Sequence, residues 1–383
     1  MDLSLTPEQH TLRATARDFV DAEIVPNRQE WDRVESVDRG IVDKLGTVGF
    51  LGLTVPERYG GAGGNHLDYC LMMEELGRGD SSVRGIVSVS LGLVAKTILT
   101  FGSEQQKQRW LPPLCSGTSL ACFGLTEPET GSDAANLHTK ADRDGNDWVI
   151  NGSKMFITNG TWADLALVFA RTGEPGPRGI SAFLVPTDTP GFGHTEITGK
   201  LGLRGQSTGE LTLDAVRVPD DAMLGAEGTG FKIAMAALDK GRMSVAAGCV
   251  GLARGALEES VRYAGERNQF GRPIASFQLV QEMLADMAVA TDAARLLVWR
   301  VADLADRSEP IGTEASMAKL HATENAVNAA NQAIQVFGGY GYIDEYPVGK
   351  YLRDARVMTL YEGTSQVQKL LIGRALTGVN AFT

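Results

Sequence analysis

One glutamate in the C-terminal part of the chain is of a type that could do acid–base chemistry. Glu362 stands between Tyr361 and Gly363, just after an apolar stretch and before a predicted helix. Burial can raise the pKa of a carboxyl group to about 6–7, which suits abstraction of a weakly acidic proton. A simpler interpretation is that this charge only favours the positive end of a helix dipole. The residue type alone leaves both interpretations open.

A second candidate segment covers residues 123–133, where a predicted strand leads into a turn. It carries hydroxyl groups, a glycine and acids, so it can offer N–H and O–H groups to a phosphate or a polar ring. An ordinary capped turn has the same composition.

Two further segments have features of a phosphate site. Residues 335–342 contain three glycines after a predicted long helix, which lets a ligand approach the backbone. They do not form a G-x-G-x-x-G fingerprint, and a plain helix end would look similar. In residues 267–274, Arg267 and Arg272 flank Phe270, and two guanidinium groups can hold a phosphate pair. A solvated turn between helices is the alternative.

The elements that would position these residues fall into three parts. The first part reads as helices, beginning at Thr6 with Pro7 at the first helical position. The middle part alternates strands and turns, and Asn151-Gly152 predicts a hairpin turn. The last part has long amphipathic helices over 231–267, 277–306 and 313–337. We therefore predict an α+β protein with an N-terminal helical domain (1–118), a middle antiparallel β-domain (119–226) and a C-terminal four-helix bundle (227–383).

Composition restricts the class of protein. The 383 residues carry a net charge of −11, which argues against binding to nucleic acid or anionic membranes. Four isolated cysteines indicate a reducing compartment, so a cytoplasmic protein is expected, and no metal-ligand spacing occurs. The start of the chain has no signal peptide pattern. Polar residues interrupt the apolar run 85–99, so no membrane span is predicted.

Taken together and in this order, the segments resemble the acyl-CoA dehydrogenase family over essentially the whole chain, from Leu5 to Arg374. The most specific part is 335–354, where Glu345, Lys350 and Asp354 also fit the family pattern. The resemblance implies FAD as cofactor, an acyl-CoA substrate, an electron-transfer flavoprotein as electron acceptor and a homotetramer.

The resemblance also implies roles for individual residues. Glu362 would abstract the α-proton while a hydride leaves the β-carbon for FAD, and Gly241 occupies the position that carries the base in some relatives. Contacts to FAD are implied for Phe123, Leu125, Thr126, Gly131, Ser132, Phe156, Ile157, Thr158, Arg267, Phe270, Gln278, Gln335, Gly338, Gly339, Thr364 and Gln366. Contacts to the substrate are implied for Arg84, Ser132, Asp239, Arg242, Tyr361 and Gly363, with Arg242 also bracing the loop that carries Glu362.

Arg84 departs from most of the family, which keeps an uncharged residue on the helix that lines the acyl tail. Relatives similar to glutaryl-CoA dehydrogenase have an arginine there that grips a distal carboxylate, so we predict a short acyl group or one with a polar or acidic tail. Gly77 stands where the decarboxylating relatives have a glutamate, which weakens a specific glutaryl assignment. Alternatively, Arg84 pairs with Asp80 or Glu74 and has no role in binding.

Two other functions remain compatible with the sequence. The same chemistry could act on an acyl or aminoacyl (for example prolyl) group tethered to a carrier protein, because carrier proteins share the pantetheine arm of CoA. The second alternative is a non-catalytic flavoprotein with the family fold, and the intact Glu362 argues against it.

Overall fold

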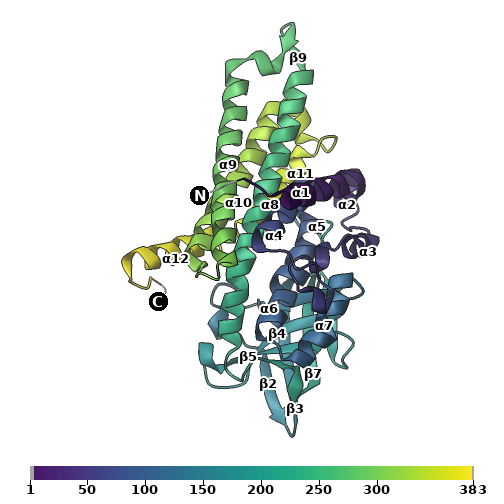
Figure 1. Cartoon of the computed structure of the whole chain (residues 1–383), viewed down its shortest axis with the longest axis vertical. Helices are drawn as coiled ribbons and strands as arrows, with labels where there is room; N and C mark the ends of the chain where they lie inside the picture. The colour runs from purple at the N-terminus through teal and green to yellow at the C-terminus, as the bar shows by residue number, and fades with distance from the viewer. Residues whose placement is uncertain (1–3, 382–383) are drawn as a thin grey trace.

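A computed structural model describes residues 4–381 (Figure 1). The N-terminal part contains seven α-helices and the π-helical stretches η1 and η4. Their bounds are α1 (Pro7–Phe19), η1 (Val20–Ile24), α2 (Arg28–Arg33), α3 (Gly40–Thr47), α4 (His66–Gly79), α5 (Ser81–Val87), η4 (Ser88–Ala95), α6 (Lys96–Phe101) and α7 (Glu104–Ser116). The predicted start of α1 is confirmed, because the Thr6 side chain accepts the Gln9 N–H in a capping box.

The middle part is one sheet of eight strands, ordered β6-β7-β3-β2-β4-β5-β8 with β1 beside β4. Most neighbours are antiparallel as predicted, but β1 and β2 both run parallel to β4. The strand bounds are β1 (Ala121–Gly124), β2 (Lys140–Asp144), β3 (Asp147–Thr158), β4 (Leu165–Arg171), β5 (Ile180–Pro186), β6 (Phe192–Glu196), β7 (Thr208–Pro219) and β8 (Met223–Leu224).

The hairpin predicted at Asn151-Gly152 is wrong. Both residues lie inside β3, and the pairing of β3 with β7 shifts register between Ile150 and Gly152, as in a β-bulge. Gly152 is required there because a Cβ would lie 2.5 Å from Thr139 Oγ1. The hairpin turn instead joins β2 and β3 at Gly145, whose φ is 65°. Glycine in a strand interior therefore marked a close approach of two backbones and not a turn.

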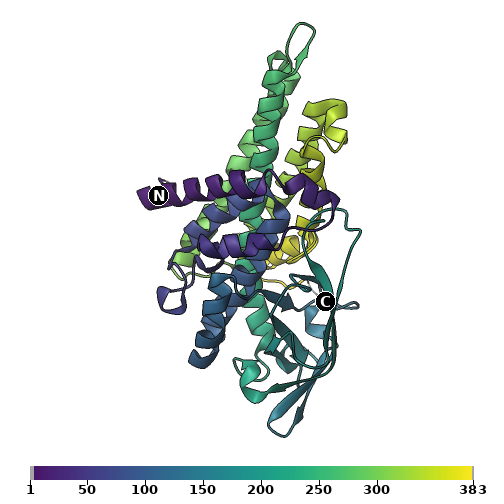
Figure 2. The same cartoon turned by 90° about the vertical axis from the view of Figure 1, so that its right-hand side faces the viewer.

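The C-terminal part confirms the predicted long helices within one residue or two. It consists of α8 (Gly230–Glu266), α9 (Gln278–Asp306), α10 (Gly312–Phe337), α11 (Val348–Met358) and α12 (Ser365–Thr377), with the two-residue strands β9 (Asn268–Gln269) and β10 (Arg272–Pro273). Helix α8 is the central element, since α4, α9 and α10 all pack along it. The sheet lies at one end of the molecule and the α8–α9 tip at the other (Figures 1 and 2).

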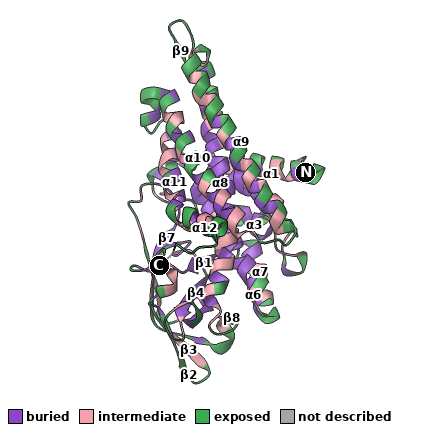
Figure 3. Cartoon of the chain, turned by 90° about the vertical axis from the view of Figure 1, so that its left-hand side faces the viewer, coloured by how far each residue is buried: buried purple, intermediate pink, exposed green. Residues whose placement is uncertain are grey.

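The helical run over residues 81–101 is long and apolar enough to span a membrane by length and composition, although the polar residues within it predicted no span. Most of it is buried, as in the core helix of a globular protein: α5 packs against α4, and η4 packs against α8 and β1. Figure 3 shows buried residues gathered in the interior around α8. Its middle turns, Ser88–Ala95, wind as a π-helix, a rare form that is frequent at functional sites.

Candidate functional site

Glu362 lies in the short turn between α11 and α12 and has a left-handed backbone, with φ 52°. Gly363 follows with φ 92°. A non-glycine residue in this conformation costs about 1–3 kcal/mol and persists where the surrounding structure enforces it. The strain at Glu362 is therefore an observation that points to function.

The carboxylate of Glu362 reaches α8 at Gly241. A Cβ built on Gly241 would lie 2.2 Å from Glu362 Oε2, so only glycine leaves room for the carboxylate. Oε2 is buried and has no hydrogen-bond partner among the described residues. Burial raises the pKa of Glu362 to about 7, although the charges of Arg84, Lys319 and Arg242 act to lower it. The group is thus poised to accept a proton near neutral pH.

Two of the predicted substrate residues lie directly beside this turn. Arg242 Nε donates to the carbonyl oxygen of Glu362 at 3.4 Å, and Arg242 Nη1 lies 2.5 Å from Asp239 Oδ1. Arg242 is itself buried. Arg242 can therefore brace the turn that carries Glu362, because its guanidinium connects α8 to the Glu362 backbone.

Arg84 is only 2% exposed and lies on α5, with Nη2 2.6 Å from the hydroxyl of Tyr361. Its Nε is buried without a hydrogen-bond partner among the described residues. The alternative that Arg84 pairs with Asp80 or Glu74 is wrong for residues 4–381, because neither carboxylate is within 4.0 Å of it. Asp80 lies beside Lys350, and Glu74 pairs with two other arginines.

A chain of buried hydroxyls, which sequence reasoning missed, crosses the same region. The Tyr69 hydroxyl lies 2.8 Å from Ser244 Oγ, which lies 2.8 Å from Ser88 Oγ. Ser88 stands one helical turn after Arg84, so the i, i+4 spacing of the two polar residues was the available signal. The structure adds Tyr69 from α4 and Ser244 from α8, which no local pattern connects.

The predicted flavin segments come together near the C-terminal end of β3. The amide of Met155 donates to the carbonyl of Thr126 at 2.9 Å, which joins residues 123–132 to the end of β3. Phe156 has φ 60° and is 67% exposed, so its ring is free to cover a ligand. Ile157 is 3% exposed and packs in the core of the sheet, which leaves only its backbone for a cofactor.

A buried ion pair stabilises the segment 123–132. Lys154 Nζ lies 2.7 Å from Glu127 Oε1, and the Glu127 carboxylate also accepts the amides of His138 and Thr139. These bonds fix the loop that carries the exposed residues Gly131 and Ser132. The pair was not anticipated from the sequence, because its partners are separated by 27 positions.

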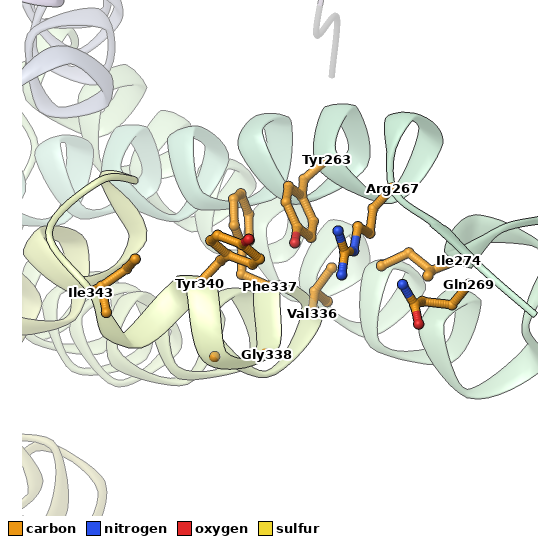
Figure 4. Close-up of a pocket in the computed structure, with 10 residues that line it drawn as sticks. Tyr263, Arg267, Gln269, Ile274, Val336, Phe337, Gly338, Tyr340 and Ile343 are labelled. Atoms are coloured by element: carbon orange, nitrogen blue, oxygen red, sulfur yellow. The ribbon is translucent and has the colours of Figure 1, made fainter.

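The second group of predicted cofactor residues surrounds a cavity of about 430 Å³ between the C-terminal ends of α8 and α10, near the α8–α9 tip (Figure 4). Arg267, Gly338 and Gly339 line it together with the rings of Tyr263 and Tyr340. A Cβ on either glycine would meet no atom within 4 Å. The cavity therefore offers a guanidinium, bare backbone and aromatic faces, which fit the phosphates and the adenine of FAD.

Other predicted contacts lie near these groups. Phe270 is 93% exposed at the tip, while Gln278 begins α9 and Gln335 is an exposed residue near the end of α10. Thr364 caps α12 by accepting the Val367 amide, and Gln366 is exposed beside it.

The tip cavity and the Glu362 turn are far apart within one chain. Gly241 and Arg267 are separated by 26 positions along α8, which is about 39 Å at 1.5 Å per residue. One dinucleotide cannot bridge both groups in a single chain. The residues predicted to contact FAD thus fall into two separate groups, each a candidate half-site.

The comparisons with known proteins agree with this geometry. The models for the N-terminal, middle and C-terminal domains of acyl-CoA dehydrogenase match residues 6–118, 122–216 and 228–377. An acyl-CoA dehydrogenase of Bacillus subtilis is 46% identical, with 98% of this chain and all of that protein covered. The structure of butyryl-CoA dehydrogenase from Megasphaera elsdenii is 42% identical over 98% of this chain and 100% of that one, with a TM-score of 0.96. A glutaryl-CoA dehydrogenase from Mycobacterium smegmatis in complex with FADH2 is 39% identical over 99% and 97% of the two chains, with a TM-score of 0.95. The chain therefore belongs to the acyl-CoA dehydrogenase family of FAD-dependent oxidoreductases.

Proposed function

We propose that this enzyme introduces a double bond between the α and β carbons of a short acyl-CoA, or of one with a polar or acidic tail, and that Glu362 is the base. The observation that carries the proposal is the buried, unpartnered Oε2 of Glu362, whose pKa of about 7 matches a proton acceptor. The α C–H bond breaks toward this carboxylate, and the β C–H bond loses its hydrogen together with the electron pair. FAD, when bound, supplies the acceptor for that hydride.

The other residues bind and orient. In this proposal the backbone N–H of Glu362 donates to the thioester oxygen as negative charge develops on it. Arg242 supports the same segment from α8 through its hydrogen bond to the Glu362 carbonyl. Phe156 and Thr158, at the end of β3, and Thr126, just after β1, are the residues that would hold the flavin ring. Asp239 and Ser132 contact the thioester arm.

Arg84 and the hydroxyl chain favour a polar acyl tail. A buried guanidinium without a carboxylate partner leaves a charge that an anionic ligand group can satisfy. Ser88 brings a hydroxyl to the same side of the helix. A Cβ on Gly77 would lie 2.2 Å from the Gly248 carbonyl, so no carboxylate can stand at that position. An acid-tailed substrate is thus supported without a specific assignment to glutaryl-CoA.

The test is an anaerobic titration, followed by turnover kinetics, with butyryl-CoA and glutaryl-CoA, which differ by one terminal carboxylate, in wild type and in Arg84→Met. We expect wild type to bleach the flavin spectrum with either thioester, and Arg84→Met to lose kcat/KM for glutaryl-CoA by about 10²-fold or more relative to butyryl-CoA. The exposed Arg143→Met serves as the control. An equal loss for both thioesters would remove Arg84 from tail recognition, and no bleaching by either would favour a carrier-tethered substrate.

Gly241 provides a second prediction. In Gly241→Ala the new methyl group would overlap Glu362 Oε2 and lie 2.8 Å from Leu93 Cδ2, so the carboxylate must move. We expect turnover of the preferred thioester to fall by about 10²-fold, because base and substrate lose their alignment, with flavin content unchanged. Gly265→Ala, on the same helix with no atom within 4 Å, should behave as wild type. Equal activity of the two variants would contradict the proposed carboxylate position.

The separation of the two half-sites supports an oligomer, most simply a homotetramer in which the tip of one copy completes the FAD site of another. Exposed apolar residues at the α8–α9 tip (Phe270) and along α9 (Leu279 and Val289) suit such an interface. Sedimentation of the holoenzyme as a monomer would exclude it. An electron-transfer flavoprotein is the proposed electron acceptor.

A further inference from the structure

Lys319 is a buried lysine beside the Glu362 turn that the proposed mechanism does not use. It lies on α10, is 0% exposed, and its Nζ donates to the carbonyl oxygen of Gly363 at 2.8 Å. No carboxylate lies within 4.0 Å of its Nζ among residues 4–381. Burial lowers the pKa of Lys319 to about 8, so the charged form is held at a cost.

Three donors from three helices converge on two consecutive carbonyl groups. Gln368 Nε2, from α12, donates to the carbonyls of Glu362 at 3.1 Å and of Gly363 at 3.0 Å. Arg242 reaches the Glu362 carbonyl from α8, and Lys319 reaches the Gly363 carbonyl from α10. These two residues have φ 52° and 92°, so the donors hold a backbone conformation that a glutamate rarely adopts.

The positive charges around the Glu362 carboxylate come from three different helices. Arg84 approaches from α5, Arg242 from α8 and Lys319 from α10, and all three act to lower the pKa of Glu362. The neutral hydroxyls of Tyr69 and Tyr361 and the thiol of Cys249 also lie within the same electrostatic environment. Asp239 pairs with Arg242, and Glu324 lies near Lys319 and accepts from Ser365 Oγ at 2.5 Å.

We propose that Lys319 is a positioning residue for Glu362: its ammonium holds the Gly363 carbonyl, fixes the left-handed turn and places a positive charge beside the carboxylate. The inference rests on the proposed function of Glu362 as the base. Lys319 neither gives up nor accepts a proton in the reaction and takes part in no bond change. Its two effects are separable, because one is geometric and the other is electrostatic.

The geometric effect predicts a loss of rate without a loss of binding. In Lys319→Met we expect kcat to fall by about 10²-fold while KM changes little, because the misplaced base affects proton abstraction more than thioester binding. The electrostatic effect predicts that the acid limb of the pH–rate profile moves to higher pH, since removal of a nearby positive charge raises the pKa of a carboxyl group. Lys319→Arg, which retains charge and donors, should recover part of both.

A second readout isolates the proton step from the flavin. Acetyl-CoA has α-hydrogens but no β-carbon, so its exchange with D₂O, followed by mass spectrometry, reports abstraction alone. Lys319→Met should slow this exchange and shift its pH dependence in the same direction as turnover. The exposed Lys232→Met is the matched control, and Lys319→Gln replaces the methionine variant if that does not fold. Flavin content and melting temperature are measured for each.

The outcomes separate the two levels of the proposal. If Glu362→Gln abolishes exchange but the Lys319 variants keep the wild-type rate and pH midpoint, the role of Lys319 is overturned and the base assignment stands. A rate loss in Lys319→Met that is fully explained by lost flavin, with an unchanged pH midpoint, also overturns it. If Glu362→Gln itself retains exchange, the assignment of Glu362 as the base is overturned, and the proposed function fails with it.

Discussion

Replacement of Glu362 by glutamine is expected to reduce acyl-CoA oxidation by about 10²–10⁴-fold, the usual contribution of a general base. Glutamine has nearly the same shape, so the turn between α11 and α12 and the hydrogen bonds of Arg242 and Gln368 to the backbone carbonyls can remain. The amide cannot accept a proton at neutral pH. The variant should therefore fold, bind FAD and fail in the chemical step.

The pH dependence provides a second test of the same residue. Burial raises the pKa of Glu362 to about 7, so the wild-type rate should increase as the pH rises through 7 and the carboxyl group loses its proton. Rapid mixing of enzyme and thioester under anaerobic conditions, with the flavin absorbance followed from pH 5 to pH 9, measures this limb. The exposed Glu227→Gln should keep both the rate and the limb.

Stability should change in the direction opposite to activity. A carboxyl group whose folded pKa lies above its unfolded value favours folding only at low pH, and this contribution is lost as the pH rises through the folded pKa. Above pH 7 the buried charge of Glu362 therefore opposes folding. The melting temperature of Glu362→Gln at pH 8 should equal or exceed that of wild type. For activity, a Glu362→Gln variant that oxidises acyl-CoA at close to the wild-type rate would contradict the assignment of Glu362 as the base.

The sequence predicted the elements of the fold better than it predicted the contacts of the site. The long helices over 231–267, 277–306 and 313–337 were identified because amphipathic periodicity is a local property of the chain. The hairpin predicted at Asn151-Gly152 was wrong because Gly152 is needed for a different reason: Thr139, on a neighbouring segment, leaves no room for a Cβ there. Local turn statistics contain no information about that neighbour.

The same distinction holds within the site. Glu362 and Arg242 could be proposed from a family resemblance, but the space at Gly241 that admits the carboxylate appears only when α8 and the turn are together. Lys319 gave a weak signal, a lysine on the apolar face of an alanine-rich helix. Its hydrogen bond to Gly363 spans 44 positions and depends on tertiary packing. The predicted partners of Arg84 were wrong for the same reason, since other cations already occupy them.

Lys350→Met is expected to have the largest effect on stability, a loss of about 3–5 kcal/mol in the free energy of unfolding. Lys350 is buried on α11, with Nζ 2.8 Å from Asp80 Oδ2 and 2.6 Å from Asp354 Oδ2. The two carboxylates raise the pKa of Lys350 although burial acts to lower it. Urea denaturation at fixed protein and flavin concentration measures the loss, and the exposed Lys369→Met should be neutral.

The two carboxylates explain why this lysine affects distant parts of the molecule. Asp80 Oδ1 accepts the amides of Ser82 and Val83 at the start of α5, the helix that carries Arg84. Asp354 Oδ1 accepts the amide of Leu203, which ties α11 to the loop before β7. Without Lys350 both aspartates would remain buried without a cation.

The loss in Lys350→Met should depend on pH in a defined direction. Burial penalises the charged form of a carboxylate, so the cost of two uncompensated buried carboxylates increases as the pH rises. The difference between variant and wild type should therefore be small near pH 4–5 and large near pH 8. Adding Asp80→Asn and Asp354→Asn to Lys350→Met removes both charges and should abolish the pH dependence, because the amides can still accept the backbone N–H groups. A pH-independent loss in the single variant would mean that packing of the lysine stem, and not its charge, stabilises this junction.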